Sequence, residues 1–344
     1  MASLWGGRFE KDMDDIVKRY NASIFFDQRM YNEDIDGSIA HVTMLGKQGI
    51  VSNEEKDQII AGLEAIRKDI ADGKIVFNVE DEDIHMGIES RLIQRIGDVG
   101  KKLHTSRSRN DQCQVDTRLY LRKEIYEILH SLCYLESVIL EKADKYADQI
   151  TVGFTHLQHA QPITIGFIFM AYFQMFKRDI ERLTDTLERL NYNPLGACAL
   201  AGTTMPIDRH LTSELLHFTA PTENAMDAVS DRDYSLEFLS DASISMMHLS
   251  RWAEELAWWN SFEFSYITID DSSCTGSRIM PQKKKPDMAR PLKMPGYPVT
   301  TILAIVITFI ICMTCSSTQM IKSLCLMATS IPAYFIFRAI EKKD

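Results

Sequence analysis

Apolar residues recur at alternating steps of four and three along the centre of the chain. Residues 110–152 contain neither glycine nor proline. Side chains at this spacing share one face of a helix and form a seam that packs along its whole length. The pattern therefore predicts one long helix with a continuous contact face. The seam consists of Leu121, Ile125, Ile128, Leu132, Leu135 and Ile139.

A second seam follows Pro162, a residue that suits the first turn of a helix. Residues 222–275 also lack glycine and proline and predict one or two further helices. Helices of this length must bundle to cover their apolar stripes, within one chain or between chains. We therefore predict an all-α fold built on a long-helix bundle, with the stripes in its core. The second seam consists of Phe169, Phe173, Phe176, Ile180, Leu183, Leu187 and Leu190.

The character of the sequence changes near residue 290. Prolines at 291, 295 and 298 would end a helix there, and residues 294–321 carry no charge. By length and hydropathy this apolar span is a candidate transmembrane helix, although nothing before it suggests a membrane. We expect three parts: a mainly helical N-terminal domain (1–105), a central bundle domain (106–290) with a catalytic loop at 275–287, and an apolar tail (291–344).

The overall charge limits the partners of the protein. The 344 residues include 38 basic and 48 acidic side chains, which gives a net charge of -10. This excess argues against a general nucleic-acid binder, whose affinity comes largely from phosphate neutralisation. Anionic ligands must then be bound by local clusters of basic and hydroxyl side chains.

The N-terminus and the cysteines indicate the compartment. The opening residues are charged and contain no apolar core of a secretory signal. Seven cysteines show no disulfide-framework spacing, so a reducing cytoplasm is the simplest interpretation. Cys312 and Cys315 form one CxxC pair, but without a second pair it does not predict a metal or redox site.

Short segments between the predicted helices concentrate polar chemistry. The first is "HTSRSRND" at 104–111, directly before a long helix. Its guanidinium and hydroxyl donors, together with a helix N-terminus, suit a carboxylate ligand. An equally good interpretation is a helix cap with surface arginines, since Asn110 and Asp111 are good capping residues.

The second segment, "FTHLQHAQP", carries two histidines. His156 or His159 could act as a proton donor or acceptor near neutral pH. The two are also spaced as metal ligands one helical turn apart, but no nearby acidic residue completes such a site, so we predict no metal. A structural role remains open for either histidine.

The third segment is the loop "TGSRIMPQKKKPD" at 275–287. From Thr275 to Lys293 there are six basic residues against one acidic one, in a chain that is acidic overall. A nuclear-localisation-like basic run is one interpretation. The other is a loop in which cations stabilise an ionised Ser277 and a carbanion next to a carboxylate. That chemistry is proton abstraction followed by elimination.

These segments together resemble the argininosuccinate lyase family of the fumarase, aspartase and adenylosuccinate lyase superfamily. The motifs "LWGGRF", "DEDIHMGIE", "TSRSRNDQ", "THLQHAQP" and "GSRIMPQKKKPD" occur in the family's order, over roughly residues 1 to 289. The resemblance implies a cytoplasmic homotetramer that acts in arginine biosynthesis. Its reaction cleaves argininosuccinate to fumarate and arginine, without a cofactor or a metal.

The resemblance also implies roles for single residues. Ser277 corresponds to the base that removes a proton from the succinyl Cβ, and His156 to the group that helps protonate the leaving guanidinium nitrogen. Lys283 corresponds to the cation that stabilises the carbanion. In this family each active site draws on more than one subunit. Residues that bind or surround substrate are Ser23, Asp83, His85, Ser108, Arg109, Asn110 and Thr155.

The resemblance fails from within the lysine loop onward. Arg278 stands where the family has a second serine, Lys285 where it has asparagine, and Arg290 where it has an acidic residue that supports the catalytic histidine. We therefore expect a C-terminal part that is lost or scrambled, by a shifted reading frame or a sequencing error, and a chain with little or no activity. The alternatives are a genuine replacement of the tail, an inactive structural relative such as the crystallin-type members, and a membrane-tethered helical protein.

Overall fold

The structure, a computed structural model, describes residues 14–273. Backbone contacts divide the chain into a first unit, Met1–Thr268, and a second, Ile269–Asp344. Of the described elements, all but the short helix η5 (Asp271–Ser273) belong to the first unit. The predicted divisions at residues 105 and 290 stay predictions. The helices of the first unit are α1 (Asp15–Asn21), α2 (Ile24–Asp27), η2 (Gln28–Met30), α3 (Tyr31–Lys47), α4 (Asn53–Ala71), η3 (Val79–Asp81), α5 (Ile84–Ile96), α6 (Asp98–Lys101), η4 (Lys102–His104), α7 (Arg109–Lys145), α8 (Ile165–Leu190), α9 (Arg209–Leu215), α10 (Ala225–Ser230) and α11 (Asp233–Trp259).

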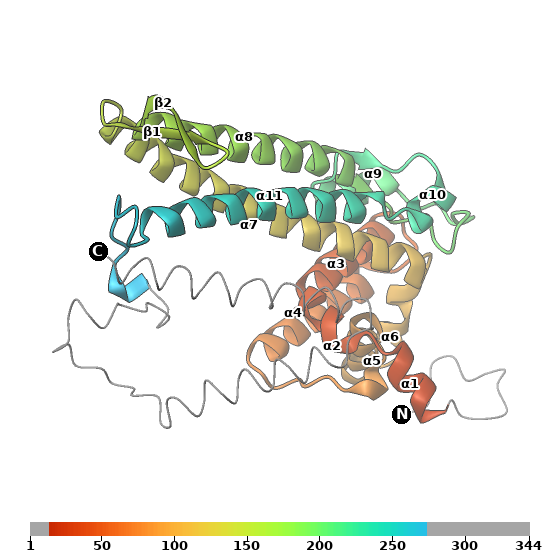
Figure 1. Ribbon diagram of the computed structural model, residues 1–344. Helices are drawn as coiled ribbons and strands as arrows, with labels where there is room; N and C mark the ends of the chain where they lie inside the picture. The colour runs from red at the N-terminus through yellow and green to blue at the C-terminus, as the bar shows by residue number, and fades with distance from the viewer. Residues whose placement is uncertain (1–13, 274–344) are drawn as a thin grey trace, which may run out of the picture. The chain divides into compact units, whose positions relative to one another are not determined.

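The three longest helices, α7, α8 and α11, form a bundle (Figure 1). Both predicted seams lie in its core. On α7 the residues Ile125, Leu132 and Ile139 are buried, and on α8 Phe176 and Leu183 are almost completely so. The intervening seam residues are partly buried against the same core. The predicted all-α long-helix bundle is therefore confirmed, and the third predicted segment is α10 and α11 as far as residue 259.

A second apolar core lies among α3, α4 and α5, which pack beside the first part of α7 (Figure 1). Polar positions interrupt the apolar pattern of α3. Asp34, Ser38 and His41 are buried at steps of four and three, on the side of α3 that faces α5 and α7. This row of polar residues forms one wall of the candidate site.

The segment after α7 differs from the prediction. We expected an irregular connector and a helix start at Pro162, but residues 150–164 form an antiparallel hairpin of β1 (Ile150–Thr155) and β2 (Gln158–Thr164). His156 and Leu157 both have positive φ, at 52° and 59°, as a tight two-residue hairpin turn requires. The sequence lacks the usual Asn-Gly signal for such a turn, so the hairpin was not predictable from turn residues. The other strands, β3 (Tyr192–Asn193) and β4 (Ala220–Pro221), make one short parallel pair.

Between residues 14 and 273, no helix combines the length and the apolar character needed to cross a membrane. The predicted transmembrane candidate and the Cys312–Cys315 pair lie outside the described residues.

Candidate functional site

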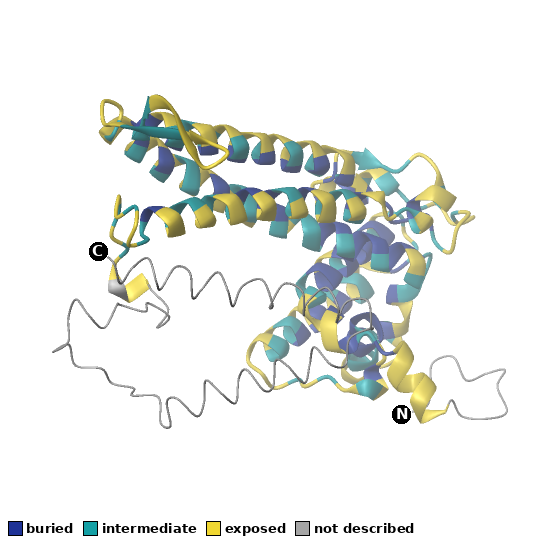
Figure 2. Ribbon diagram, viewed as in Figure 1, coloured by how far each residue is buried: buried dark blue, intermediate teal, exposed yellow. Residues whose placement is uncertain are grey.

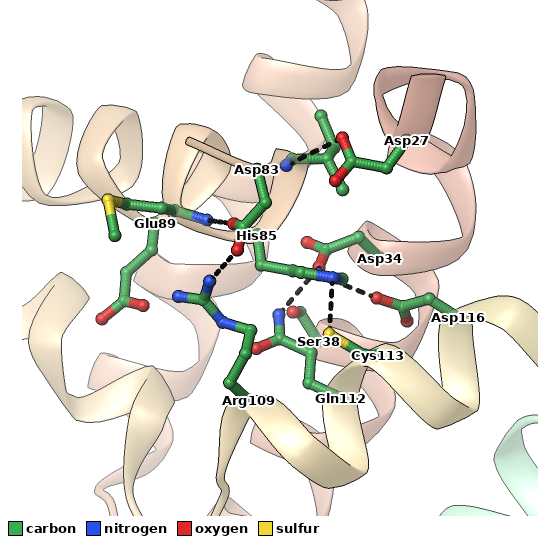
Figure 3. A network of polar contacts seen from close by, with 12 residues as sticks. Asp27, Asp34, Ser38, Asp83, His85, Glu89, Arg109, Gln112, Cys113 and Asp116 are labelled. Carbon is green, nitrogen blue, oxygen red and sulfur yellow. Dashed lines mark hydrogen bonds and ion pairs between the residues drawn. The ribbon is translucent and has the colours of Figure 1, made fainter. Parts of the chain in front are cut away.

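A corner of the first unit brings together three of the predicted substrate residues, of which Figure 3 shows Asp83 and Arg109. Asp83 caps the start of α5, where its Oδ1 accepts from the Met86 N–H at 2.7 Å. Its Oδ2 accepts from Nη1 of Arg109, the first residue of α7. The backbone N–H of Ser23 donates to the carbonyl of Glu82 at 2.9 Å, which holds Ser23 beside the same loop. The corner therefore joins three separate parts of the sequence.

The start of α7 is fixed by a capping box. Ser108 is the N-cap, and its side-chain oxygen accepts from the Asn110 N–H. Asp111 completes the box, because its Oδ1 accepts from the Ser108 N–H at 2.9 Å. The predicted helix cap is confirmed, with Ser108 and Asp111 rather than Asn110 as its capping residues, and it aims Arg109 at Asp83. Arg107 is buried rather than at the surface, and the carboxylate ligand stays a prediction.

Asp111 also ties this helix start to a distant loop. Its Oδ2 accepts from the N–H groups of Gly196 and Cys198, at 3.0 and 2.8 Å. Burial raises the pKa of the Asp111 carboxyl, although the three N–H donors oppose that shift. Asn110 points to the same loop and donates its Nδ2 to the carbonyl of Ala199 at 2.8 Å.

His85 lies in the interior behind this corner (Figure 3). Its Nδ1 is 2.6 Å from Asp34 Oδ2 and 3.1 Å from Asp116 Oδ2, and its Nε2 is 3.1 Å from Cys113 Sγ. Gln112 also donates to Asp34, at 2.7 Å. The ring is only 3% exposed and its Nδ1 faces these carboxyl groups. His85 therefore lies behind the Asp83–Arg109 corner and is not exposed in it.

The charge state of this cluster follows from burial and pairing. Burial opposes a charge on His85, but hydrogen bonds with Asp116 and Asp34 outweigh it and raise the pKa of the ring well above its ordinary value. Burial also opposes ionisation of Asp34, yet the hydrogen bond from His85 leaves its pKa lowered. For Asp116, burial and the neighbouring Asp34 charge raise the pKa to about 8.

Asp34, His85 and Asp116 are also of the types that ligate metals, and their ligand atoms lie within 4.8 Å of one another. Because the pKa of His85 is raised well above its ordinary value, the ring is protonated at both nitrogens near neutral pH and carries a positive charge beside the two carboxyl groups. The ion pairs of His85 with Asp34 and Asp116 are thus sufficient to explain why these three side chains lie together.

Thr155 and His156 lie elsewhere in the first unit, exposed at the hairpin turn. With a rise of 1.5 Å per residue, the 37 residues of α7 span about 55 Å. The 11 residues from Lys145 to His156 reach at most about 39 Å when fully extended. One chain therefore cannot place His156 against its own Arg109, and Figure 1 shows the hairpin at the end of the bundle away from α5.

The remaining predicted catalytic residues, Ser277 and Lys283, lie outside the described residues. So do Arg278, Lys285 and Arg290, where the family resemblance fails.

Sequence reasoning missed the buried residues that hold the corner together. Asp116 lies in the helix that the first seam predicts, Asp34 lies in α3, for which the pattern predicts no seam, and Asp111 is predicted only as a helix cap. A usable signal was present, because Asp34, Ser38 and His41 repeat at helical spacing along one face of α3. Charged residues are almost never fully buried unless they are paired, so such a row indicates a polar network.

The sequence profile of the family described as "Lyase" matches residues 7–299. The chain belongs to this lyase family. Among the similar members are argininosuccinate lyases from Carboxydothermus hydrogenoformans and Heliobacterium mobile. Each is 56% identical over 286 residues, which is 83% of this chain but only 63% and 62% of those proteins. The chain thus spans less than two thirds of their length.

Solved structures of lyases show the same fold. A variant of EDDS lyase with bound fumarate matches with a TM-score of 0.69 and 32% identity, over 75% of this chain and 51% of that one. A fumarate lyase from Mesorhizobium sp. BNC1 matches with a TM-score of 0.60 and 18% identity, over 74% of this chain and 60% of that one. The second likeness concerns the fold alone.

Proposed function

We propose that this member of the lyase family carries the machinery of an argininosuccinate lyase. The observation that carries the proposal is the Asp83–Arg109 corner at the start of α7, within a chain that is 56% identical to argininosuccinate lyases over 83% of its length. The fumarate bound to the related EDDS lyase supports a site for a four-carbon dicarboxylate. A guanidinium group and the N-terminus of a helix suit such a ligand.

In the proposed reaction, Ser277 takes the proton from the succinyl Cβ and leaves a carbanion next to a carboxylate. Lys283 stabilises that charge. The carbon–nitrogen bond then breaks, and His156 helps to protonate the departing guanidinium nitrogen, which yields fumarate and arginine. These steps involve no change of oxidation state in a cofactor, and proton transfer and electrostatic stabilisation suffice for them.

The substrate would lie against the residues at the start of α7. Arg109 is held by Asp83, so its guanidinium group is oriented before a ligand arrives. Ser108 and Asn110 flank it, and Ser23 lies across the loop from it. Thr155 and His85 complete the proposed set, Thr155 from the hairpin and His85 from behind the corner.

Assembly follows from the separation of these groups. Since Arg109 and His156 cannot meet within one chain, the proposed site needs a second chain that supplies the hairpin. We propose a homotetramer that works in the cytoplasm. The exposed apolar residues Leu236, Leu239, Met246 and Met247 on α11 provide a contact face for it.

The test compares the chain with a repaired version. In the repaired version, the residues after 274 are replaced by the corresponding segment of the Carboxydothermus hydrogenoformans relative. We expect this chimera to release fumarate from argininosuccinate and the unrepaired chain to release little. The ultraviolet absorbance of fumarate measures the release. Arg109→Lys in the chimera should lower kcat/KM about tenfold or more, because lysine cannot replace a bidentate guanidinium group. Activity of the chimera on adenylosuccinate but not on argininosuccinate would refute the proposal.

A further inference from the structure

Three ionisable side chains from three helices meet in the interior beside the Asp83–Arg109 pair (Figure 3). Asp34 of α3, His85 of α5 and Asp116 of α7 are 1%, 3% and 0% exposed. Two carboxylates and one imidazolium would leave a net negative charge where no water reaches it. Such a charge is expensive to bury, so one more proton is needed to balance the group.

The hydrogen bonds show where that proton belongs. Asp34 Oδ2 accepts from both His85 and Gln112, at 2.6 and 2.7 Å. In the described residues no group makes a hydrogen bond to Asp34 Oδ1 or to either carboxyl oxygen of Asp116. One carboxyl oxygen of Asp34 and one of Asp116 lie within 4.8 Å of each other, so a proton on Asp116 supplies a donor beside Asp34.

We propose that Asp34, His85 and Asp116 form a neutral triad of carboxylate, imidazolium and carboxylic acid, and that this triad positions Asp83 opposite Arg109. Asp83 precedes His85 by two residues at the start of α5, and Arg109 precedes Asp116 by seven, two turns along the same face of α7. The triad therefore clamps the first turn of α5 to the first turns of α7. This inference deepens the proposed function, on which it relies only for the ligand that the corner binds.

The surroundings support this assignment of charges. Besides the triad itself, the groups that act on it are Cys113 at His85 Nε2, Arg107 near Asp34 and Asp27 near His85. The Arg107 charge favours the anion on Asp34 rather than on Asp116. Gly37 gives Asp116 room, because a Cβ at this position would lie 3.2 Å from Asp116 Oδ1.

Two isosteric variants of the full chain distinguish the carboxyl groups. Asp116→Asn keeps a neutral donor beside Asp34 and should preserve the triad. Asp34→Asn removes the anion that pairs with the imidazolium and leaves only a neutral amide oxygen for the donors of His85 and Gln112. We expect Asp116→Asn, which does not titrate, to abolish the loss of stability that the wild type shows between about pH 4 and about pH 8, whereas Asp34→Asn should lower the urea midpoint throughout. An Asp116→Asn variant that is as unstable as Asp34→Asn, or that does not fold, overturns the assignment.

The positioning of Asp83 opposite Arg109 is tested by an NMR signal that a change in stability alone does not shift. The Arg109 guanidinium resonance, assigned in ¹⁵N spectra by comparison with Arg109→Lys, should be the same in Asp116→Asn as in the wild type. It should shift in Asp34→Asn, and in the wild type it should shift as Asp116 ionises above about pH 8. If Asp34→Asn fails to fold, the pH-dependent shift of the Arg109 resonance in the wild type, and its absence in Asp116→Asn, are sufficient to test the positioning role. A resonance that never moves would show that the triad is only structural.

Calorimetry with argininosuccinate links the triad to the proposed function. We expect Asp116→Asn to bind within about twofold of the wild-type Kd and Asp34→Asn to bind at least about tenfold more weakly. Equal affinity in both variants would contradict positioning. If the wild type itself binds no argininosuccinate, the proposed function fails, while the urea midpoints and the Arg109 resonance still decide the triad.

Discussion

At the scale of single residues, buried titratable groups make the stability depend on pH in opposite directions. His41 lies inside the first unit, and its Nε2 donates to the carbonyl of Thr105 at 2.8 Å. Burial, with help from the charge on Arg107, lowers its pKa to about 3. Between this value and the ordinary 6.5 the unfolded chain binds more protons than the folded one. The contribution of His41 is therefore complete above pH 6.5 and is lost as the pH falls.

We predict that His41→Gln flattens the acid side of the stability profile. Glutamine keeps a donor for the Thr105 carbonyl but does not titrate. The wild type should lose up to about 1.4 kcal/mol per pH unit below 6.5 from this residue, and the variant should not. Urea unfolding at several pH values measures the difference. His130→Gln, an exposed change on α7, is the control; an identical acid slope in His41→Gln and the wild type would contradict the prediction.

As the pH rises, His85 and Asp116 act in the other direction. Both have a raised pKa in the folded chain, so their contributions are complete below their unfolded values and are lost as the pH rises through the folded ones. For Asp116 the loss runs from about 4 to about 8, since the folded value is about 8. The stability should therefore be greatest in the weakly acid range, because above pH 6.5 His41 adds nothing further while His85 and Asp116 lose their contributions.

At the scale of elements, Asp111 joins the start of α7 to the loop at 194–198. Three backbone N–H groups depend on its carboxylate, from Ser108, Gly196 and Cys198. We predict that Asp111→Ala destabilises the protein by about 2–4 kcal/mol, because buried N–H donors lose their acceptor. Urea unfolding measures the loss, and Glu141→Ala, exposed near the other end of the same helix, should cost little. Similar losses for the two variants would mean that the tie to the loop contributes nothing.

The seam of α8 allows a matched comparison within one helix. Phe176 is completely buried, whereas Phe167 is 66% exposed. We predict that Phe176→Ala costs about 3–5 kcal/mol in the free energy of unfolding, because it leaves a cavity among packed side chains. Phe167→Ala should cost less than about 1 kcal/mol. Chemical denaturation of both variants tests this. Comparable losses of unfolding free energy would mean that Phe176 does not lie on the packed face of α8.

The same elements show what the sequence could reveal. The seams of α7 and α8 were predictable because alternating steps of four and three are a property of each helix by itself. The hairpin was not, because a non-glycine pair at positive φ gives no turn signal. In the candidate site, Arg109 and Asp83 were found through the resemblance, while their supports Asp34, Asp111 and Asp116 depend on contacts between distant segments.

At the scale of the whole molecule, α11 has two apolar faces. Tyr234, Trp252 and Trp259 belong to the bundle core. On the opposite face, the side chains of Leu236, Leu239, Met246 and Met247 are 45–63% exposed, and Figure 2 shows exposed residues along this helix. At 100° per residue these four positions form one stripe. A continuous apolar stripe on an otherwise well-packed bundle is typical of a surface that another chain covers.

We therefore predict that the double variant Leu239→Glu and Met246→Glu separates the chains without unfolding them. Two carboxylates on the stripe would have to be buried without partners in an assembly, whereas they are hydrated in the separated chain. Light scattering should show a fall in molecular mass, and circular dichroism should show unchanged helix content. Lys68→Glu on α4 is the control, because it is exposed and changes the net charge by the same two units.

Loss of assembly should also remove activity, even though neither substitution lies near Arg109 or His156. These two groups are held at separate places in each chain, and the 55 Å length of α7, about 1.5 Å for each of its 37 residues, keeps them there. In the repaired chimera, the double variant should therefore lose nearly all fumarate release while Lys68→Glu retains it. A separated chain with full turnover would mean that one chain completes the site alone, which the length of α7 does not allow.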